Sequence, residues 1–332
     1  MSDAGPAAAR RAERLLRCYP AGWRERYGEE FAELLMDDIG ERPRSWVRTA
    51  DVVRSGTLAR LAATGLAGQT LEPERQLRAG LAWLGAATTA FLALGVAIWS
   101  ELTIGWQWSP PATPATRVAM LLMSAAILIF AILALLAAIP IAWSLGTAVA
   151  RGRERRLLAP LALAMAAAAA FTLGSIHFGH GWPGTGGHQW VERGLVPGDV
   201  ARFCWAATLW VTSYWAHPGA LSSFPATEIG WMVVSPLTLA AMAVGATMIL
   251  RRTPLSPRVL RYESRLGAAA VLAMAVFLAG AGSWVISGGP APRGLFRVGA
   301  IDSVGVVALA AELMLAVRAL QRALPAAARH RP

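Results

Sequence analysis

The chain contains no lysine, and all 31 of its Lys or Arg residues are arginines. This absence excludes three chemistries: the Walker A lysine of P-loop ATPases, the strand lysine of protein kinases, and a Schiff base to pyridoxal phosphate. Cysteine is also scarce, because Cys18 and Cys204 are the only two and form no metal-binding motif. We further expect no cleaved signal peptide, since residues 1–78 carry dense mixed charge.

Charged residues are few, at 15% of the chain, whereas 55% of it is hydrophobic. This balance favours a protein whose apolar surface faces lipid. A membrane-spanning helix needs about 20 mainly apolar residues. The sequence predicts six such spans, at residues 79–100, 118–138, 157–178, 229–250, 266–286 and 298–317. We therefore predict an all-α fold, with a polytopic membrane helix bundle over residues 79–317 that contacts the lipid bilayer.

The arginines predict the orientation of these spans. They cluster after the second span, at residues 151–156, and after the fourth, at residues 251–265. Because short Arg-rich loops stay in the cytoplasm, we expect a protein of the cell (inner) membrane with both termini cytoplasmic, and a basic tail at residues 318–332. Cys18 and Cys204 then fall on opposite sides, which excludes a disulfide. Nucleic acid is not an expected partner, since residues 1–78 hold thirteen Arg against twelve Asp and Glu.

One apolar segment, residues 200–217, is ambiguous. If the loops at residues 151–156 and 251–265 are both cytoplasmic, an even number of spans must separate them. Counting this segment as a span would place three spans between the two loops. We interpret it as one re-entrant or interfacial helix on the outer side. The alternative is a seventh span, which would place the basic tail outside.

The first 66 residues predict a small cytosolic three-helix module, which a linker at residues 67–78 joins to the first span. Pro20 is expected to end its first helix, and Gly40 and Pro43 its second. Trp23, Tyr27 and Phe31 recur at helical spacing between glutamates, which predicts one apolar stripe on a charged helix. On the third helix of the module, the side chains expected to face the core are Trp46, Val53, Leu58 and Leu61.

Two short runs in this module resemble a known family. Residues 15–20 (LLRCYP) and 23–31 (WRERYGEEF) are similar to a helical prefix module found at the front of many actinobacterial membrane proteins. Similar prefixes precede permeases of the FtsX-like type and small membrane proteins thought to act in regulation. The resemblance covers roughly the first fifth of the chain and implies no particular activity. This chain departs from those permeases in having only short outer loops.

Three histidines form a candidate metal site at the outer face. His177 and His180 are three residues apart at the end of a predicted helix, so they can share a face. The glycine-rich loop that follows can bring His188 near them, and three imidazoles can hold Zn or Cu. The spacing matches no metal signature, and polar capping of the helix end is the alternative. We predict no other cofactor.

Two acidic residues lie within or beside the sixth span. Glu312 is inside it and Asp302 is near its outer end. Ionisable groups within a membrane are energetically costly, so Glu312 is a candidate proton or ion site. The alternative is a structural ion pair with Arg265 or Arg318 at the cytoplasmic border, reached by snorkelling.

Three further acidic residues lie near the end of the second helix of the module. Asp37, Asp38 and Glu41 resemble the pattern that binds magnesium–diphosphate in isoprenoid enzymes. No second acidic motif faces them, so we interpret them as solvated charge at a helix end.

These observations leave three functional hypotheses. The first is a non-enzymatic regulatory or scaffolding membrane protein, whose residues 1–66 dock a cytosolic protein partner. The second is a permease or transport subunit with its pathway between the spans and Glu312 as the in-membrane group. The third is an outer-face metal-binding protein or enzyme that uses the three histidines. Small-residue pairs such as Ala241 and Gly245 fit close helix packing, either within the bundle or between subunits of an oligomer.

Overall fold

The computed structural model describes residues 4–63, 73–103, 113–150, 155–180, 196–211, 219, 222, 224–253, 255–287 and 300–329. Within these ranges the chain forms ten α-helices and one 3-10 turn, and it contains no strand. The chain divides into two compact units, Met1–Ala79 and Gly80–Pro332, which we call unit 1 and unit 2.

Unit 1 contains helices α1 (Ala4–Leu16), α2 (Ala21–Glu41) and α3 (Trp46–Ala63). Two prolines separate them, as the sequence predicts. Pro20 is the N-cap of α2, with φ −67° and ψ 156°, and its missing N–H prevents α1 from continuing. Pro43 disfavours helical geometry at Arg42, so α2 ends at Glu41.

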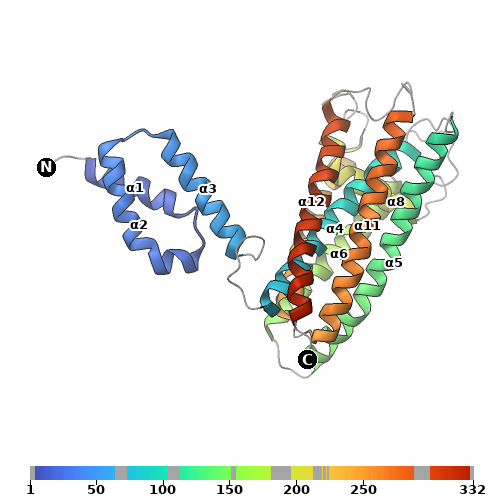
Figure 1. The fold of residues 1–332 in the computed structure, drawn as a ribbon. Coiled ribbons are helices and arrows are strands. Elements are labelled where there is room, and N and C mark those ends of the chain that lie inside the picture. Colours follow the sequence, from blue (N-terminus) through green and yellow to red (C-terminus); the bar gives the residue numbers. More distant parts are fainter. Residues whose placement is uncertain are drawn as a thin grey trace. The chain divides into compact units, whose positions relative to one another are not determined.

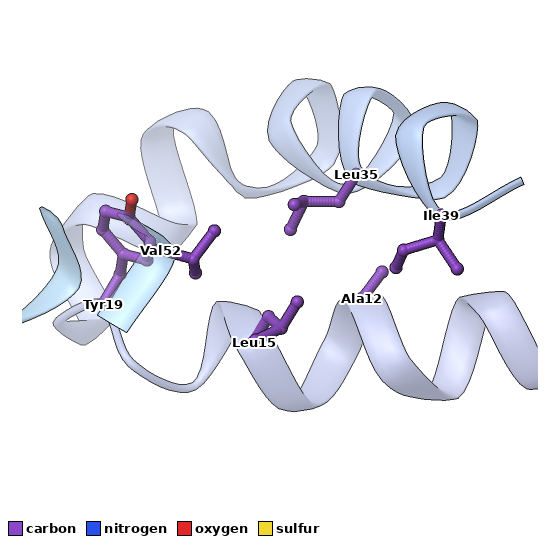
Figure 2. Close-up of a cluster of buried hydrophobic side chains, with 6 residues drawn as sticks. All are labelled: Ala12, Leu15, Tyr19, Leu35, Ile39 and Val52. Atoms are coloured by element: carbon purple, nitrogen blue, oxygen red, sulfur yellow. The ribbon is translucent and has the colours of Figure 1, made fainter. Parts of the chain in front are cut away.

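The core of unit 1 consists of six buried side chains (Figure 2). They come from all three helices and the α1–α2 connection: Ala12, Leu15, Tyr19, Leu35, Ile39 and Val52. Trp23 and Phe31 are half-buried and pack against this cluster, whereas Tyr27 is 41% exposed. The predicted stripe therefore points only partly inward, because Leu35 and Ile39 occupy the centre of the interface with α1.

The inward face of α3 differs from the predicted one. Trp46 is 80% exposed, and Val53 and Leu58 are exposed as well, whereas Val52 and Gly56 are buried. An added Cβ at Gly56 would lie 2.7 Å from Cys18 Cβ. The prediction was wrong because α3 approaches the α1–α2 connection through its smallest residue, which leaves the larger apolar side chains on the outer face.

A buried arginine links α2 to α3. Arg48 Nη1 donates hydrogen bonds to Asp38 O and Asp38 Oδ2, both at 2.9 Å, and to Arg42 O at 3.0 Å. The Arg48 side chain is only 7% exposed. A cation at this position satisfies free carbonyl groups at the C-terminus of α2. Asp38 is thus a structural ion-pair partner, which corrects its interpretation as purely solvated charge.

Unit 2 contains most of helix α4, which begins before the boundary between the units, and all the helices that follow it (Figure 1). They are α4 (Pro73–Thr103), α5 (Pro114–Ala150), η1 (Arg155–Leu157), α6 (Leu158–His180), α8 (Val196–Thr208), α10 (Ala226–Arg252), α11 (Pro257–Ser287) and α12 (Ala300–Arg329). Six of these helices are long and apolar enough to cross a membrane, and each overlaps one predicted span. The chain is therefore a multi-pass membrane protein.

The helices of unit 2 differ in how deeply they lie in the bundle. Within its span, 56% of α4 is buried, compared with 17% of α5. Large apolar side chains are exposed along the whole of α5, among them Leu121, Leu128, Ile132, Leu135 and Ile139. Such a continuous apolar surface suits contact with lipid tails. Helix α5 packs along α11, α11 along α12, and α10 along α6 and α8.

Close helix contacts depend on small residues, as predicted. An added Cβ at Gly245 in α10 would lie 2.9 Å from Ala164 Cβ in α6. This contact is within the bundle, which is one of the two arrangements that the sequence allowed.

The helices run beyond the predicted span limits at both ends. Helix α4 begins inside the predicted linker, and α12 continues through most of the predicted tail at residues 318–332. An added Cβ at Gly80 would lie 3.1 Å from Ala319 O and from Ala323 Cβ. The start of the tail is therefore a packed helix, because α4 and α12 meet through alanine and glycine at this level.

Arg156 and Arg252, one from each arginine-rich segment, lie at the same end of the bundle. Arg252 Nη1, at the end of α10, donates a hydrogen bond to Arg156 O in η1 at 3.1 Å. The geometry agrees with the parity argument, which requires both segments on one side of the membrane.

Helix α8 covers the start of the ambiguous segment. It is buried on most sides against α6 and α10, and even Asp199 and Arg202 are buried. Its 13 residues rise about 20 Å, less than a bilayer core of about 30 Å. An interfacial helix would keep a polar face in water, so the burial agrees better with a short helix held inside the bundle. Residues 212–217 lie outside the described ranges.

Candidate functional site

A half-open cavity of about 370 Å³ lies between helices of unit 2. Helices α4, α8, α10 and α12 all contribute to its wall, and seven of the lining residues are alanines. Small side chains cannot fill the space between four helices, so the cavity follows directly from this composition. Its volume is within the range of about 300–1,000 Å³ that is typical of small-molecule sites.

Two helices present regularly spaced residues to this cavity. On α12, Gly305, Ala308 and Glu312 are three and four residues apart, which places them on one helical face. On α10, Pro236 and Ala240 are four residues apart and also line the wall. Pro236 has no N–H to offer Met232 O, and the neighbouring Ser235 Oγ donates to that carbonyl instead, at 3.0 Å.

Among the described residues that line the cavity, Glu312 is the one ionisable side chain. Its Oε2 atom is buried and has no hydrogen-bond partner in the described part of the chain. Glu312 forms no ion pair with Arg265 or Arg318 there, so the predicted structural alternative is not observed. Because a buried carboxyl without a partner is costly, this oxygen is a candidate contact for a ligand.

Two threonines provide the remaining polar side chains of the wall. Thr89 Oγ1 donates to Gly85 O and Thr208 Oγ1 donates to Cys204 O, both at 2.7 Å. Each hydroxyl proton is therefore used within its own helix, while the hydroxyl oxygen keeps lone pairs. The polar side chains of the wall thus offer acceptors, and the described lining holds no cationic group.

The second predicted acidic residue, Asp302, is in the first turn of α12. Its side chain lies outside what the structure describes, so its proposed role stays a prediction.

The histidine site extends beyond the described residues. His177 on α6 is exposed and stacks on Trp231 of α10, with ring centroids 6.0 Å apart and an interplanar angle of 5°. His180 ends α6, but its side chain is not described, and His188 lies outside the described ranges. Within those ranges no group of three His, Cys, Asp or Glu could hold a metal ion. A Zn or Cu site built from all three histidines therefore stays a prediction.

A second hollow, of about 300 Å³, lies on helix α2 of unit 1. We call it the α2 groove, and it is lined by Trp23, Tyr27, Glu30, Phe31 and Leu34. Trp23 is held by stacking on Tyr19, with centroids 4.0 Å apart, and Phe31 meets both rings edge-on at 5.4 Å. Two side chains of the predicted stripe thus anchor the groove to the core.

The outer wall of the α2 groove is open to solvent. Tyr27 and Leu34 are 41% and 66% exposed, and neither belongs to the core of unit 1. The Arg26 guanidinium lies 5.3 Å from the centre of the Tyr27 ring, a favourable cation–π distance. Beneath the groove, burial raises the pKa of the Tyr19 phenol.

Comparison with known proteins supplied no relative for either site. The scan against protein-family models, the search of curated proteins and the search of solved structures each returned no match. The likeness of residues 15–31 to the prefix module therefore stays a resemblance.

The sequence offered only partial signals for these sites. Glu312 was evident as a charge inside a span, and Trp23 and Phe31 as part of a stripe. Thr89, Thr208 and the alanines of the wall were missed, because nothing in their local sequence separates a cavity wall from ordinary helix packing. Pro236 was the available signal, since a proline inside a span marks an irregular helix.

Proposed function

We propose that this chain is a non-enzymatic membrane protein whose N-terminal unit docks a cytosolic protein, so that its role is regulatory or scaffolding. The observation that carries this proposal is the α2 groove. Exposed aromatic and apolar side chains around a hollow are typical of protein interaction sites.

The exposure of Tyr27 and Leu34 supports this proposal because folding does not require it. The core of unit 1 closes without them, through six other side chains. Two large apolar residues that remain in water beside a hollow favour a binding role over a packing role.

Copurification from membranes tests the docking proposal. We expect the full-length protein to recover a partner that is lost both on deletion of residues 1–66 and in the double variant Tyr27→Ala, Leu34→Ala. Leu58→Ala is the matched control, because Leu58 is another exposed apolar residue, on α3. Equal recovery of every partner by all four proteins would contradict the proposal.

Both termini are proposed to lie in the cytoplasm. The support is the even number of candidate spans in the described part of the chain, together with the contact between Arg252 and Arg156, because Arg-rich ends stay inside. Reporter fusions after Leu221 and after Arg258 should report opposite sides of the membrane. The same side for both would overturn this topology.

A second candidate function is a permease or transport subunit, favoured by the Glu312 carboxyl in a cavity between four helices. An ionisable group within the membrane is often part of a solute or proton pathway. Glu312→Gln should then abolish an uptake or efflux phenotype. Unchanged transport at normal protein levels would remove Glu312 from that pathway.

A further inference from the structure

We propose that the Glu312 cavity binds a small organic cation, an ammonium group carried on a compact apolar body. The proposal uses the site of the second candidate function, but it concerns binding alone and does not require that the ligand be moved across the membrane.

The charge of the ligand follows from the polar groups of the wall. An ionised carboxylate in a largely apolar cavity is stabilised by a countercharge, and the described lining supplies none. An ammonium group supplies this charge and also brings three hydrogen-bond donors. Glu312 Oε2 is free to accept one of them, and the Thr89 and Thr208 oxygens are acceptors on the same wall.

The apolar body follows from the rest of the wall. Apart from Glu312 and the two threonines, every lining residue that the structure describes is Ala, Gly, Leu, Val or Pro. A bare metal ion such as Ca²⁺ or Mg²⁺ needs about six oxygen ligands, and this wall is too apolar to provide them. A proton alone would neutralise Glu312, but it would not occupy the apolar space of about 370 Å³ beside the carboxyl.

The size of the cavity limits the ligand to a compact molecule. The volume is near the lower end of the range typical of small-molecule sites. Adamantylamine is a suitable probe, because it joins an ammonium group to a compact hydrocarbon cage. Adamantanol has the same cage with a neutral hydroxyl, so the pair isolates the effect of charge.

The experiment is equilibrium dialysis of the full chain in nanodiscs of phosphatidylcholine, a lipid without net charge that does not concentrate the amine. We expect the wild-type protein to bind adamantylamine about ten-fold more tightly than adamantanol. Glu312→Gln should abolish this preference and leave adamantanol binding unchanged. Glu263→Gln is the matched control, since Glu263 is a buried carboxyl on α11 that does not line the cavity. It should retain the preference.

A second variant tests the site by shape. Ala308→Leu adds bulk to the cavity wall and should weaken both probes. Three results would each overturn the proposal: equal affinity of the wild type for amine and alcohol, an amine affinity that Glu312→Gln does not change, or no saturable binding of the amine. A cavity occupied by lipid tails would give the third result.

Binding and transport can fail separately in this design. Loss of transport in Glu312→Gln with unchanged amine binding would reject the present proposal and leave the second candidate function standing. Selective amine binding by a protein that supports no transport would reject that function and leave the binding site standing.

Discussion

The two units of this chain differ in how large and small apolar residues are distributed. In unit 1, the core is formed mainly by larger side chains such as Leu35 and Ile39, while Leu34 and Leu58 are exposed among charged side chains. In unit 2, leucines such as Leu128 and Leu135 face outward, while Gly245 and Ala323 are buried between helices. An exposed leucine therefore has a different meaning in each unit, because the solvent is water for one and lipid for the other.

Arginine shows the same division. In unit 1, Arg48 and Arg60 cross-link the elements by donating to backbone carbonyls, Arg60 to Cys18 O and Arg17 O. In unit 2, arginines such as Arg252 collect where spans end, and Arg252 bridges two such ends. The polar network thus holds the fold together in one unit and marks the membrane border in the other.

Replacing one exposed leucine in each unit by arginine should give the largest difference between the units. Leu128→Arg lies near the middle of a predicted span and should oppose membrane insertion by about 2.5–3.5 kcal/mol. Leu58→Arg, on the exposed face of α3, should have little effect. The measurement is the yield of each full-length variant in the membrane fraction.

Equal yields of the two arginine variants would show that the outer face of α5 does not contact lipid. Leu128→Ala serves as the control for loss of the side chain alone. It should insert normally, because Leu128 is 62% exposed and packs little within the bundle.

The buried arginine of unit 1 should give the next largest effect. Arg48→Met keeps the apolar stem but removes three hydrogen bonds, one of them to a carboxylate. We expect a loss of about 2 kcal/mol in the free energy of unfolding, since hydrogen bonds to charged groups contribute about 1.5–3 kcal/mol. This loss can be measured by urea unfolding of residues 1–66, monitored by circular dichroism.

Asp38→Asn is the control for the charge of this pair. Asp38 is 45% exposed, so its charge is screened by water, and its backbone carbonyl still accepts from Arg48 after substitution. This variant should lose less stability than Arg48→Met. The opposite order would show that the ion pair, rather than the carbonyl capping, holds α2 to α3.

A glycine comparison within unit 1 should give a smaller effect. Gly56→Ala would put a methyl group 2.7 Å from Cys18 Cβ, and we expect a loss of about 1–3 kcal/mol from overpacking. Gly22→Ala meets nothing within 4 Å and should leave stability unchanged or raise it by up to about 1 kcal/mol. Two equal unfolding curves would contradict the close approach of α3 to the α1–α2 connection.

The features that could be predicted from the sequence are those that depend on one stretch of chain. Apolar length is a local property, so all six spans were found, and Pro20 and Pro43 marked helix ends because proline acts on its immediate neighbours. Glu312 was recognisable for the same reason, since a charge within an apolar stretch is visible without knowing its contacts.

The features that could not be predicted depend on which faces of two helices meet. The inward face of α3 was misjudged because hydrophobicity favours Trp46, whereas the contact at Gly56 requires the smallest side chain. The role of Arg48 depends on carbonyls at the end of another helix. The cavity wall needs the register of four helices at once, which no local pattern contains.

The smallest predicted effect is the response of unit 1 to alkaline pH. Burial raises the pKa of Tyr19 above the value of about 10 for a free phenol. In the interval between these two values the folded unit binds more protons than the unfolded chain, so its stability decreases with pH. The contribution is fully present below about pH 10 and is lost as the pH rises through the folded pKa.

Tyr19→Phe isolates this effect, because phenylalanine keeps a ring at the position that stacks on Trp23 but cannot titrate. Unfolding of residues 1–66 should be measured at several pH values between about 8 and 11 for both proteins, since unfolded tyrosine titrates near 10. Subtracting the unfolding free energy of the variant from that of the wild type removes the contributions of all other titrating groups. Above about pH 10 this difference should decrease, because only the wild type loses stability through Tyr19. A constant difference would show that folding does not raise the pKa of Tyr19. It would contradict burial as the dominant influence on this phenol, over the hydrogen bond with Ser55, which lowers the pKa.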